Sequence, residues 1–103
     1  MQQGGYVYIM SSPNRNTLYV GVTSNLCQRV EQHRSKFYPD GFTSKYNCVM
    51  LVYYNSFQGV EEAIFEEKRL KAGNRKQKER LINSINPDWI DLWDTVCGSG
   101  LVY

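Results

Sequence analysis

The sequence predicts a mixed α/β (α+β) fold built on an N-terminal β-hairpin, and three observations support this prediction. First, two short apolar runs that carry tyrosine flank a turn cluster at 11–16, which is the pattern of a hairpin. Second, the near-continuous apolar run at 48–54 has the length of a third strand that is covered on both faces. Third, residues 25–37, 59–71 and 75–85 repeat apolar side chains at helical spacing, so we expect three helices.

The hairpin has one register that collects its apolar side chains on one face. With a two-residue loop at 14–15, Ile9 faces Val20 and Tyr8 faces Gly21. Residues of the apolar face are then Val7, Ile9, Leu18, Val20 and Val22, and those of the other face are Tyr6, Tyr8, Thr17 and Tyr19. Tyr8 and Tyr19 become diagonal neighbours, and Gly21 leaves space for something to approach the sheet.

Length and charge indicate one domain with an uneven charge distribution. The 103 residues suffice for a single domain, which we expect at 1–97 with a flexible tail at 98–103. The net charge is +2, yet residues 68–80 contain seven basic side chains and one acid. This block is either a phosphate-binding face or a solvated helix face, and the two readings have equal weight.

The cysteines and the N-terminus bear on where the protein works. Cys27, Cys48 and Cys97 are odd in number and have no CxxC spacing, and with one histidine they predict no zinc site. A reduced, cytoplasmic protein is the simpler interpretation. No run has membrane-spanning length and no apolar leader opens the chain, so no membrane partner is expected. A monomer is assumed.

Glu67 is the acid that helical spacing turns inward. It lies four residues after Ala63 and three before Leu70, inside the apolar side of the helix at 59–71. A carboxylate placed toward the core is costly unless it is paired or bound to a cation. Two explanations therefore stay open: a metal ligand, or a salt bridge with Lys71 or Arg29.

Two other segments carry candidate functional side chains. Arg29 and His33 lie four residues apart beside the apolar stripe of the helix at 25–37, whose start resembles a capping box of Asn25 and Gln28. Taken alone, His33 fits a partly buried core histidine. The loop at 38–47 interleaves aromatic, hydroxyl and basic side chains, which suits either an anchored loop or contact with a nucleic-acid strand.

The order and spacing of these residues resemble the GIY-YIG nuclease domain, and in particular its small stand-alone bacterial members. Tyr6-Val7-Tyr8 matches the first motif and Tyr19-Val20-Gly21 the second, and the resemblance extends over residues 5–93. Further matches are Arg29 with His33, 41–43, 45–46, 51–54, Ala63-Ile64 with Glu67-Lys68, 81–82 and 86–89. Glu66 stands where relatives tend to have arginine. The fold implied is a small three-stranded antiparallel β-sheet flanked by helices.

The resemblance also implies a divalent-metal-dependent endonuclease that hydrolyses phosphodiester bonds of nucleic acid, with DNA as the expected substrate. By this likeness Tyr19 is the general base and Tyr8 its partner in orienting water or phosphate, roles that are exchanged in some members. Arg29 holds the scissile phosphate, Glu67 ligates one Mg²⁺ or Mn²⁺ ion, His33 assists proton transfer and Asn86 supports the site. The expected nucleic-acid-binding residues are Lys45, Lys68, Arg69, Lys71, Arg75, Lys76 and Lys78.

Two other classes of function remain as alternatives. One is a non-catalytic nucleic-acid-binding module that kept the fold. The other is a protein-interaction domain that uses Tyr46 and the Tyr53-Tyr54 surface. The presence of Tyr8, Tyr19, Arg29 and Glu67 together favours an enzyme, because a binding module has no need of Glu67.

Overall fold

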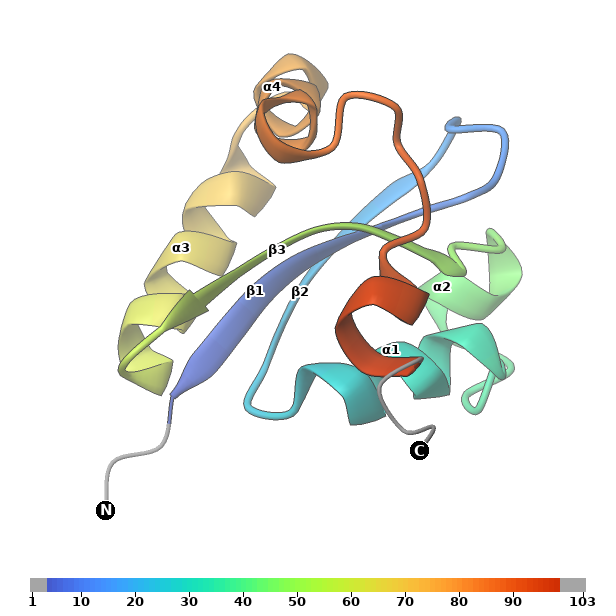
Figure 1. The fold of residues 1–103 in the computed structure, drawn as a ribbon, viewed down its shortest axis with the longest axis horizontal. Helices are drawn as coiled ribbons and strands as arrows, with labels where there is room; N and C mark the ends of the chain where they lie inside the picture. Colours follow the sequence, from blue (N-terminus) through green and yellow to red (C-terminus); the bar gives the residue numbers. More distant parts are fainter. Residues whose placement is uncertain (1–3, 99–103) are drawn as a thin grey trace.

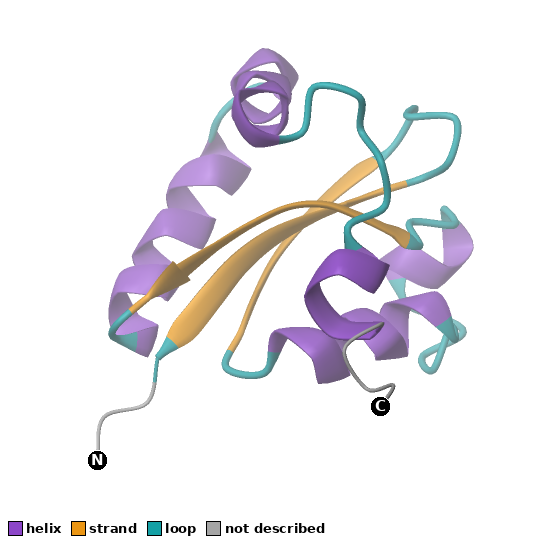
Figure 2. Ribbon diagram, viewed as in Figure 1, coloured by secondary structure: helices purple, strands orange, loops and turns teal. Residues whose placement is uncertain are grey.

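The computed structural model describes residues 4–98, in which a three-stranded antiparallel sheet has helices on both faces (Figures 1 and 2). Its elements in chain order are β1 (Gly5–Ser11), β2 (Leu18–Thr23), α1 (Leu26–Arg34), α2 (Phe42–Lys45), β3 (Met50–Phe57), α3 (Val60–Ala72), α4 (Arg75–Ile85) and the π-helical turn η1 (Asp94–Gly98). The strand order is β2-β1-β3, so β1 is central and β2 is an edge strand. This architecture confirms the predicted fold class.

The predicted hairpin register is confirmed. Tyr8 pairs with Gly21 and Ile9 with Val20. The turn is wider than the predicted two-residue loop, since it spans 13–16 and closes on the pair of Ser12 with Thr17. The ladder ends with the donation from the Ser12 N–H to the Thr17 carbonyl at 3.1 Å, and within the turn the Arg15 N–H donates to the Ser12 carbonyl at 2.9 Å.

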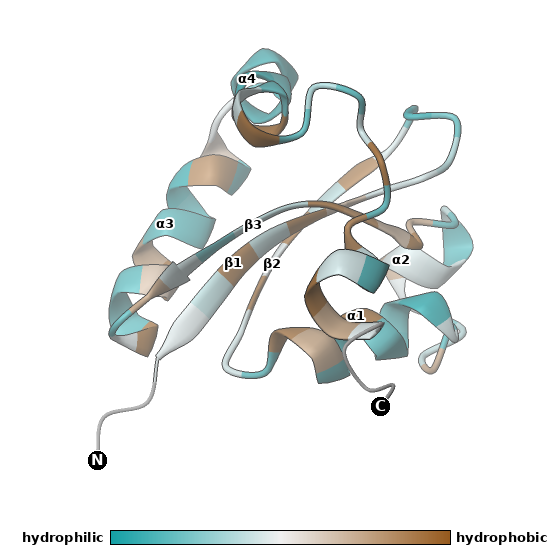
Figure 3. Ribbon diagram, in the orientation of Figure 1, coloured by the Kyte–Doolittle hydropathy of each residue, from teal (hydrophilic) through white to brown (hydrophobic). Residues whose placement is uncertain are grey.

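Each face of the sheet has its own apolar core, and Figure 3 shows the hydrophobic residues gathered along the strands between the helices. The core under α3 and α4 is built from Val7, Ile9, Val20, Val52, Tyr53, Ala63, Leu70, Ile82 and Trp89. The core under α1 and η1 is built from Tyr8, Met10, Leu26, Val30, Cys48 and Leu51. Strand alternation therefore sends the tyrosine face of the hairpin to α1, as the period of two predicts.

Two predicted boundaries are wrong. The first helix starts at its predicted cap, where Asn25 accepts a hydrogen bond from the Gln28 N–H at 3.1 Å, but it ends at Arg34. Phe37, which was expected on the apolar stripe, is 62% exposed. The expected loop at 38–47 contains the one-turn helix α2, which is too short for any periodic signal in the sequence.

The predicted reduced state is wrong for two of the three cysteines. Cys27 of α1 and Cys97 of η1 form a disulfide that joins positions 70 residues apart, with their Cα atoms at 5.6 Å. Cys48 is a buried free thiol. Spacing along the chain could not show this pairing, because the packing of η1 against α1 is what brings the two cysteines together.

The described part of the chain ends inside the last helical turn. Gly98, the first residue of the predicted tail, is also the final residue of η1, and 99–103 lie outside the described residues. Within residues 4–98, no helix combines the length and apolar character needed to cross a membrane.

Candidate active site

Tyr8 crosses from the central strand toward the edge of the sheet through the space that Gly21 leaves. A Cβ atom built on Gly21 would lie 2.4 Å from both Cζ and Oη of Tyr8. Tyr8 is 1% exposed. The sequence predicted that Gly21 leaves space for something to approach the sheet, and the group that occupies this space is the phenol ring of Tyr8.

The Tyr8 hydroxyl begins a chain of buried hydrogen bonds. Tyr8 Oη lies 2.8 Å from His33 Nε2, and His33 Nδ1 lies 2.8 Å from Thr43 Oγ1. Burial raises the pKa of Tyr8 far above its ordinary value, and the nearby Tyr19 and Glu67 add to this while Arg29 opposes it. Burial, followed by the charge of Arg29, lowers the pKa of His33 to about 4. Both groups are therefore neutral at pH 7.

Because both groups are neutral, the donor and acceptor of each hydrogen bond in this series can be assigned. A buried phenol that keeps its proton needs an acceptor, so we assign Tyr8 Oη–H as donor to Nε2 of His33. The imidazole proton is then on Nδ1 and is donated to the Thr43 hydroxyl. This arrangement leaves the Tyr8 oxygen free to accept a further hydrogen bond.

Tyr19 of the edge strand is the more accessible of the two motif tyrosines. It is half-buried, and its ring centroid lies 5.5 Å from that of His33 and 5.9 Å from that of Phe42. The ring lines a pocket of about 210 Å³ together with Arg29 and His33. It also lines a second pocket of about 280 Å³ with two lysines of α3 and α4, Lys71 and Lys78.

Arg29 reaches the same place from α1. It lines the pocket of about 210 Å³, and its charge influences the pKa of both Tyr8 and His33. A guanidinium in this position can bind a phosphate oxygen that enters the pocket. The structure thus brings together Tyr8, Tyr19, Arg29 and His33, four residues that the sequence assigned to one site.

Glu67 approaches from α3, on the opposite face of the sheet. It is 9% exposed, as the helical period predicts, and its charge influences the pKa of Tyr8. One carboxylate oxygen lies 2.7 Å from Nζ of Lys71, which itself lies 5.6 Å from the centroid of the Tyr19 ring. The salt bridge with Lys71, one of the two alternatives left open by the sequence, is therefore present.

The neighbouring acid, Glu66, does not add negative charge to this site. Both of its carboxylate oxygens accept hydrogen bonds from Arg69, at 2.9 and 2.6 Å. The bidentate pair lies on the outer side of α3, where Arg69 is exposed. Glu66 and Glu67 thus have separate partners although they are adjacent in sequence.

The residues present fit a divalent ion that is held by one carboxylate and by the substrate. No group of three or more His, Cys, Asp or Glu side chains within residues 4–98 is arranged to hold a metal ion. Mg²⁺ commonly keeps several waters and binds one or two carboxylates plus substrate phosphates, and Glu67 can supply such a carboxylate. Lys71 is half-exposed and can move into solvent when a cation replaces it.

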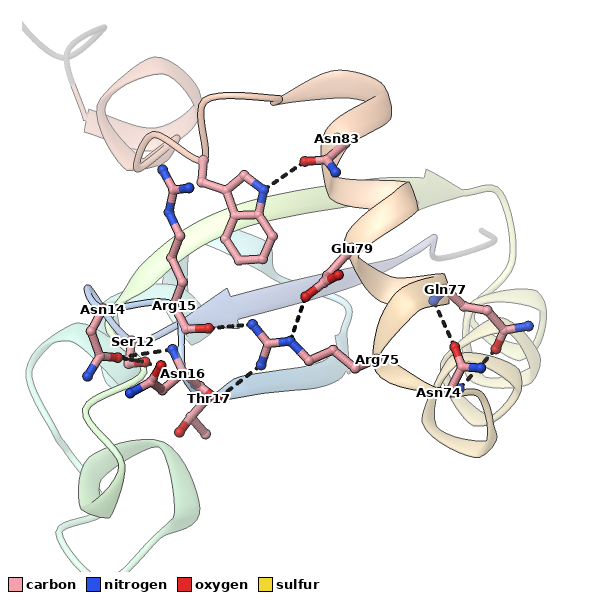
Figure 4. A network of polar contacts seen from close by, with 11 residues as sticks. Ser12, Asn14, Arg15, Asn16, Thr17, Asn74, Arg75, Gln77, Glu79 and Asn83 are labelled. Carbon is pink, nitrogen blue, oxygen red and sulfur yellow. Dashed lines mark hydrogen bonds and ion pairs between the residues drawn. The ribbon is translucent and has the colours of Figure 1, made fainter.

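The basic block is more heterogeneous than its sequence indicates. Arg75 donates to the carbonyls of Arg15 and Asn16 and to Glu79, so it ties α4 to the hairpin turn (Figure 4). Lys78 donates to the Gly73 carbonyl at 2.9 Å. These contacts give Arg75 a structural role, and its phosphate contact stays a prediction. Lys78 is half-buried, and the side chains of the predicted set that are exposed on the surface are Lys45, Lys68, Arg69, Lys71, Arg75 and Lys76.

Asn86 has a structural role too. Its side-chain amide donates to the carbonyls of Val52 and Ile90 and accepts from the Ile90 N–H, at 2.8 to 3.1 Å. These contacts join the chain after α4 to β3. The support predicted for Asn86 therefore concerns the backbone, and its amide is already engaged there.

Sequence reasoning missed Thr43 and Phe42 as members of the site. Both lie on α2, which the sequence predicted as loop. A loop prediction gives no facing direction, so nothing in the local pattern shows that Thr43 meets His33 or that Phe42 meets Tyr19. The proximity of a threonine to a histidine ten residues earlier is a product of the tertiary fold.

Comparison with known proteins found a matching family model, relatives of similar sequence and a similar solved structure. A family model described as the GIY-YIG catalytic domain matches residues 4–80. A UPF0213 protein of Pediococcus pentosaceus is 34% identical over 79 residues, which cover 77% of this chain and 81% of the relative. A UPF0213 protein of Clostridium perfringens is 36% identical over 83 residues, covering 77% and 83%. The solution NMR structure of a UPF0213 protein from Bacillus halodurans is similar with a TM-score of 0.55 and 25% identity, over 90% of this chain and 97% of that one.

Proposed function

The chain belongs to the GIY-YIG catalytic domain family, and from that premise we propose that it is a divalent-metal-dependent endonuclease that hydrolyses phosphodiester bonds of DNA. The observation that supports this proposal most is that the side chains needed for hydrolysis lie close together. Tyr19 of the sheet shares a pocket with Arg29 and His33 of α1, Tyr8 is hydrogen-bonded to His33, and the charge of Glu67 from α3 reaches Tyr8. This combination provides proton transfer, phosphate binding and a cation ligand at one site.

Tyr19 acts as the general base in this proposal. Its ring lines the pocket that Arg29 also lines, so a water beside its hydroxyl would face a bound phosphate. In this step Tyr19 reacts as its phenolate, after its own proton has passed to solvent. Oη takes the proton of the attacking water while the water oxygen bonds to phosphorus and the bond to the leaving oxygen breaks, and the leaving oxygen takes a proton from solvent. General base catalysis of this kind contributes about 10²- to 10⁴-fold to a rate.

Tyr8 orients that water and does not take its proton. Its hydroxyl proton is committed to His33, whose Nδ1–H is in turn held by Thr43. The Tyr8 oxygen can still accept a hydrogen bond from water. Arg29 holds the non-bridging phosphate oxygens and stabilises the negative charge that grows on them in the transition state.

Glu67 would hold the Mg²⁺ or Mn²⁺ ion, with Lys71 displaced from the carboxylate. Such an ion, when bound, neutralises charge on the phosphate and on the leaving oxygen. Lys71 would then turn from the carboxylate toward solvent, where its ammonium would add positive charge for binding the DNA.

The test is cleavage of labelled single-stranded, duplex and branched DNA, and of RNA, with Mg²⁺, with Mn²⁺ and with chelator. We expect DNA cleavage that needs the ion. Glu67→Gln should abolish it, whereas the matched variant Glu66→Gln should retain it, because Glu66 faces outward and pairs with Arg69. Both variants should melt close to the parent, since Lys71 is half-exposed and remains solvated without Glu67.

The ion pair of Glu67 with Lys71 favours a second candidate, a non-catalytic nucleic-acid-binding module that kept the fold. In that case Glu67 is only a partner for Lys71. A protein that binds DNA but shows no ion-dependent cleavage of any of the four substrates would favour this candidate. Cleavage that survives in Glu67→Gln would contradict the role of Glu67 as a cation ligand.

A further inference from the structure

An exposed group of aromatic side chains borders the candidate active site. Among the large apolar side chains exposed in the described residues, Phe37, Tyr38, Phe42 and Tyr46 fall within ten positions of the sequence, with exposures of 47 to 62%. Exposed apolar groups that cluster in this way mark interaction sites more often than chance. Nothing in the proposed hydrolysis uses them.

These rings form a path from the surface into the site. The centroid of Tyr46 lies 4.6 Å from that of Phe42, and the centroid of Phe42 lies 5.9 Å from that of Tyr19. Tyr38 and Phe42 both line the pocket of about 210 Å³ that contains Arg29. A ligand that contacts Tyr46 can therefore extend continuously to the proposed base.

The hollows along this path have the charge that suits a polyanion. At the outer end, Lys45 and Tyr46 line a hollow of about 440 Å³ with hydroxyl and amide side chains of the hairpin turn. At the inner end are Arg29 in one pocket and Lys71 with Lys78 in the other. No described Asp or Glu lines any of the three hollows, so a path of aromatic rings is bordered by cations throughout.

We propose that Phe42 and Tyr46 form a stacking platform for unpaired bases, which guides a single DNA strand to Tyr19 and Arg29. The ring faces of a base are available for stacking in a single strand but are covered by neighbouring base pairs in a duplex, so the platform selects unpaired DNA. The bordering lysines and arginine bind its phosphates. The proposal rests on the proposed function for the position of the scissile phosphate.

Binding without metal separates this proposal from hydrolysis itself. With chelator present, fluorescence anisotropy measures the affinity for a labelled oligothymidylate of about 20 nucleotides, which exceeds the usual site size for such platforms. The comparison ligands are a duplex of the same length and an oligouridylate. We expect the single DNA strand to bind most tightly.

The variants test the ring of Tyr46, which lies outside the proposed catalytic residues. Tyr46→Ala should weaken binding of the single strand about five- to a hundredfold, the range found when a stacking aromatic is removed. Tyr46→Phe, which keeps the ring, should bind like the parent. Phe65→Ala is the matched control, because Phe65 is a 72% exposed aromatic on α3 that lines none of the three hollows.

Four outcomes would overturn the proposal. They are duplex binding as tight as that of the single strand, oligouridylate binding tighter than oligothymidylate, Tyr46→Ala binding like the parent, and a dimer in sedimentation that Tyr46→Ala dissociates without loss of DNA affinity. Failure of cleavage alone would leave the strand preference measurable, and cleavage without strand preference would refute the platform while leaving the nuclease intact.

Discussion

Substituting Gly21 with alanine should disrupt the site from a position that carries no chemistry of its own. No described glycine has a positive φ, so backbone conformation does not require glycine at this position. What requires it is Tyr8, whose Cζ and Oη would each lie 2.4 Å from the added methyl group. Ordinary carbon contacts begin near 3.5 Å, so the ring has to move by about 1 Å.

The size of the effect follows from what surrounds that ring. Tyr8 is fully buried and its hydroxyl is 2.8 Å from His33, so a shift of this size breaks the hydrogen bond. Overpacking costs about 1–3 kcal/mol and an unsatisfied buried polar group about 1–3 kcal/mol. We therefore expect Gly21→Ala to lower the free energy of unfolding by about 2–6 kcal/mol, which corresponds to a decrease in Tm of roughly 10–30 °C in a domain of this size.

A double-mutant cycle isolates the cause. Tyr8→Leu removes Cζ, Oη and Cε1, the three atoms that the new methyl group would meet. On that background Gly21→Ala should cost less than about 0.5 kcal/mol in urea unfolding, whereas independent sites would give additive effects. Gly41→Ala, whose Cβ would lie 3.2 Å from the Tyr38 carbonyl oxygen, serves as the control glycine. Equal costs of Gly21→Ala in both backgrounds would refute the explanation.

Three further expectations concern stability. Reduction of the Cys27–Cys97 disulfide should lower the free energy of unfolding by about 2–4 kcal/mol, because the bridge closes a long loop. In the control variant Cys27→Ser, urea unfolding should be insensitive to reductant. An unchanged urea unfolding curve on reduction of the parent would contradict this expectation. The unfolded chain protonates His33 near pH 6.5 and the folded protein only near about 4, so stability should fall as the pH is lowered from about 6.5 toward 4, and His33→Gln should reduce that dependence. Arg75→Ala should lower the free energy of unfolding by about 1 kcal/mol, because it removes the contacts of Arg75 with the hairpin turn. Lys76→Ala, at an exposed neighbouring position, should leave the free energy of unfolding almost unchanged. Equal melting temperatures of the two variants would argue against the structural role of Arg75.

The hairpin and the orientation of α3 could be predicted because one physical period governs each. In the hairpin, a slip of one residue would turn Val7 and Val20 toward opposite faces, so the apolar pattern admits one register. In α3, the period of 3.6 places Glu67 between Ala63 and Leu70, and the structure buries all three. The spacing of apolar residues was sufficient to predict the structure wherever the burial of one face of a regular helix or strand determined it.

Prediction failed where contacts between distant segments decided the outcome. The disulfide depends on η1 packing against α1, and the hydrogen bond of His33 with Thr43 depends on how α2 folds back over α1. The space at Gly21 was predicted from its missing side chain, but which neighbour fills that space depends on the rotamer of Tyr8. Arg75 could not be separated from the other bases of its block, because its partners are backbone carbonyls of the hairpin turn.

The central claim is that the hydroxyl of Tyr19 performs the proton transfer of phosphodiester hydrolysis. Single-turnover cleavage of single-stranded DNA with Mg²⁺ by the parent, Tyr19→Phe and Tyr8→Phe tests it most directly, because both substitutions keep the ring and remove one oxygen. We expect Tyr19→Phe to reduce the cleavage rate about 10²-fold or more with little change in Tm, since Tyr19 is half-buried and its ring contacts remain. Cleavage by Tyr19→Phe at the rate of the parent would contradict the claim.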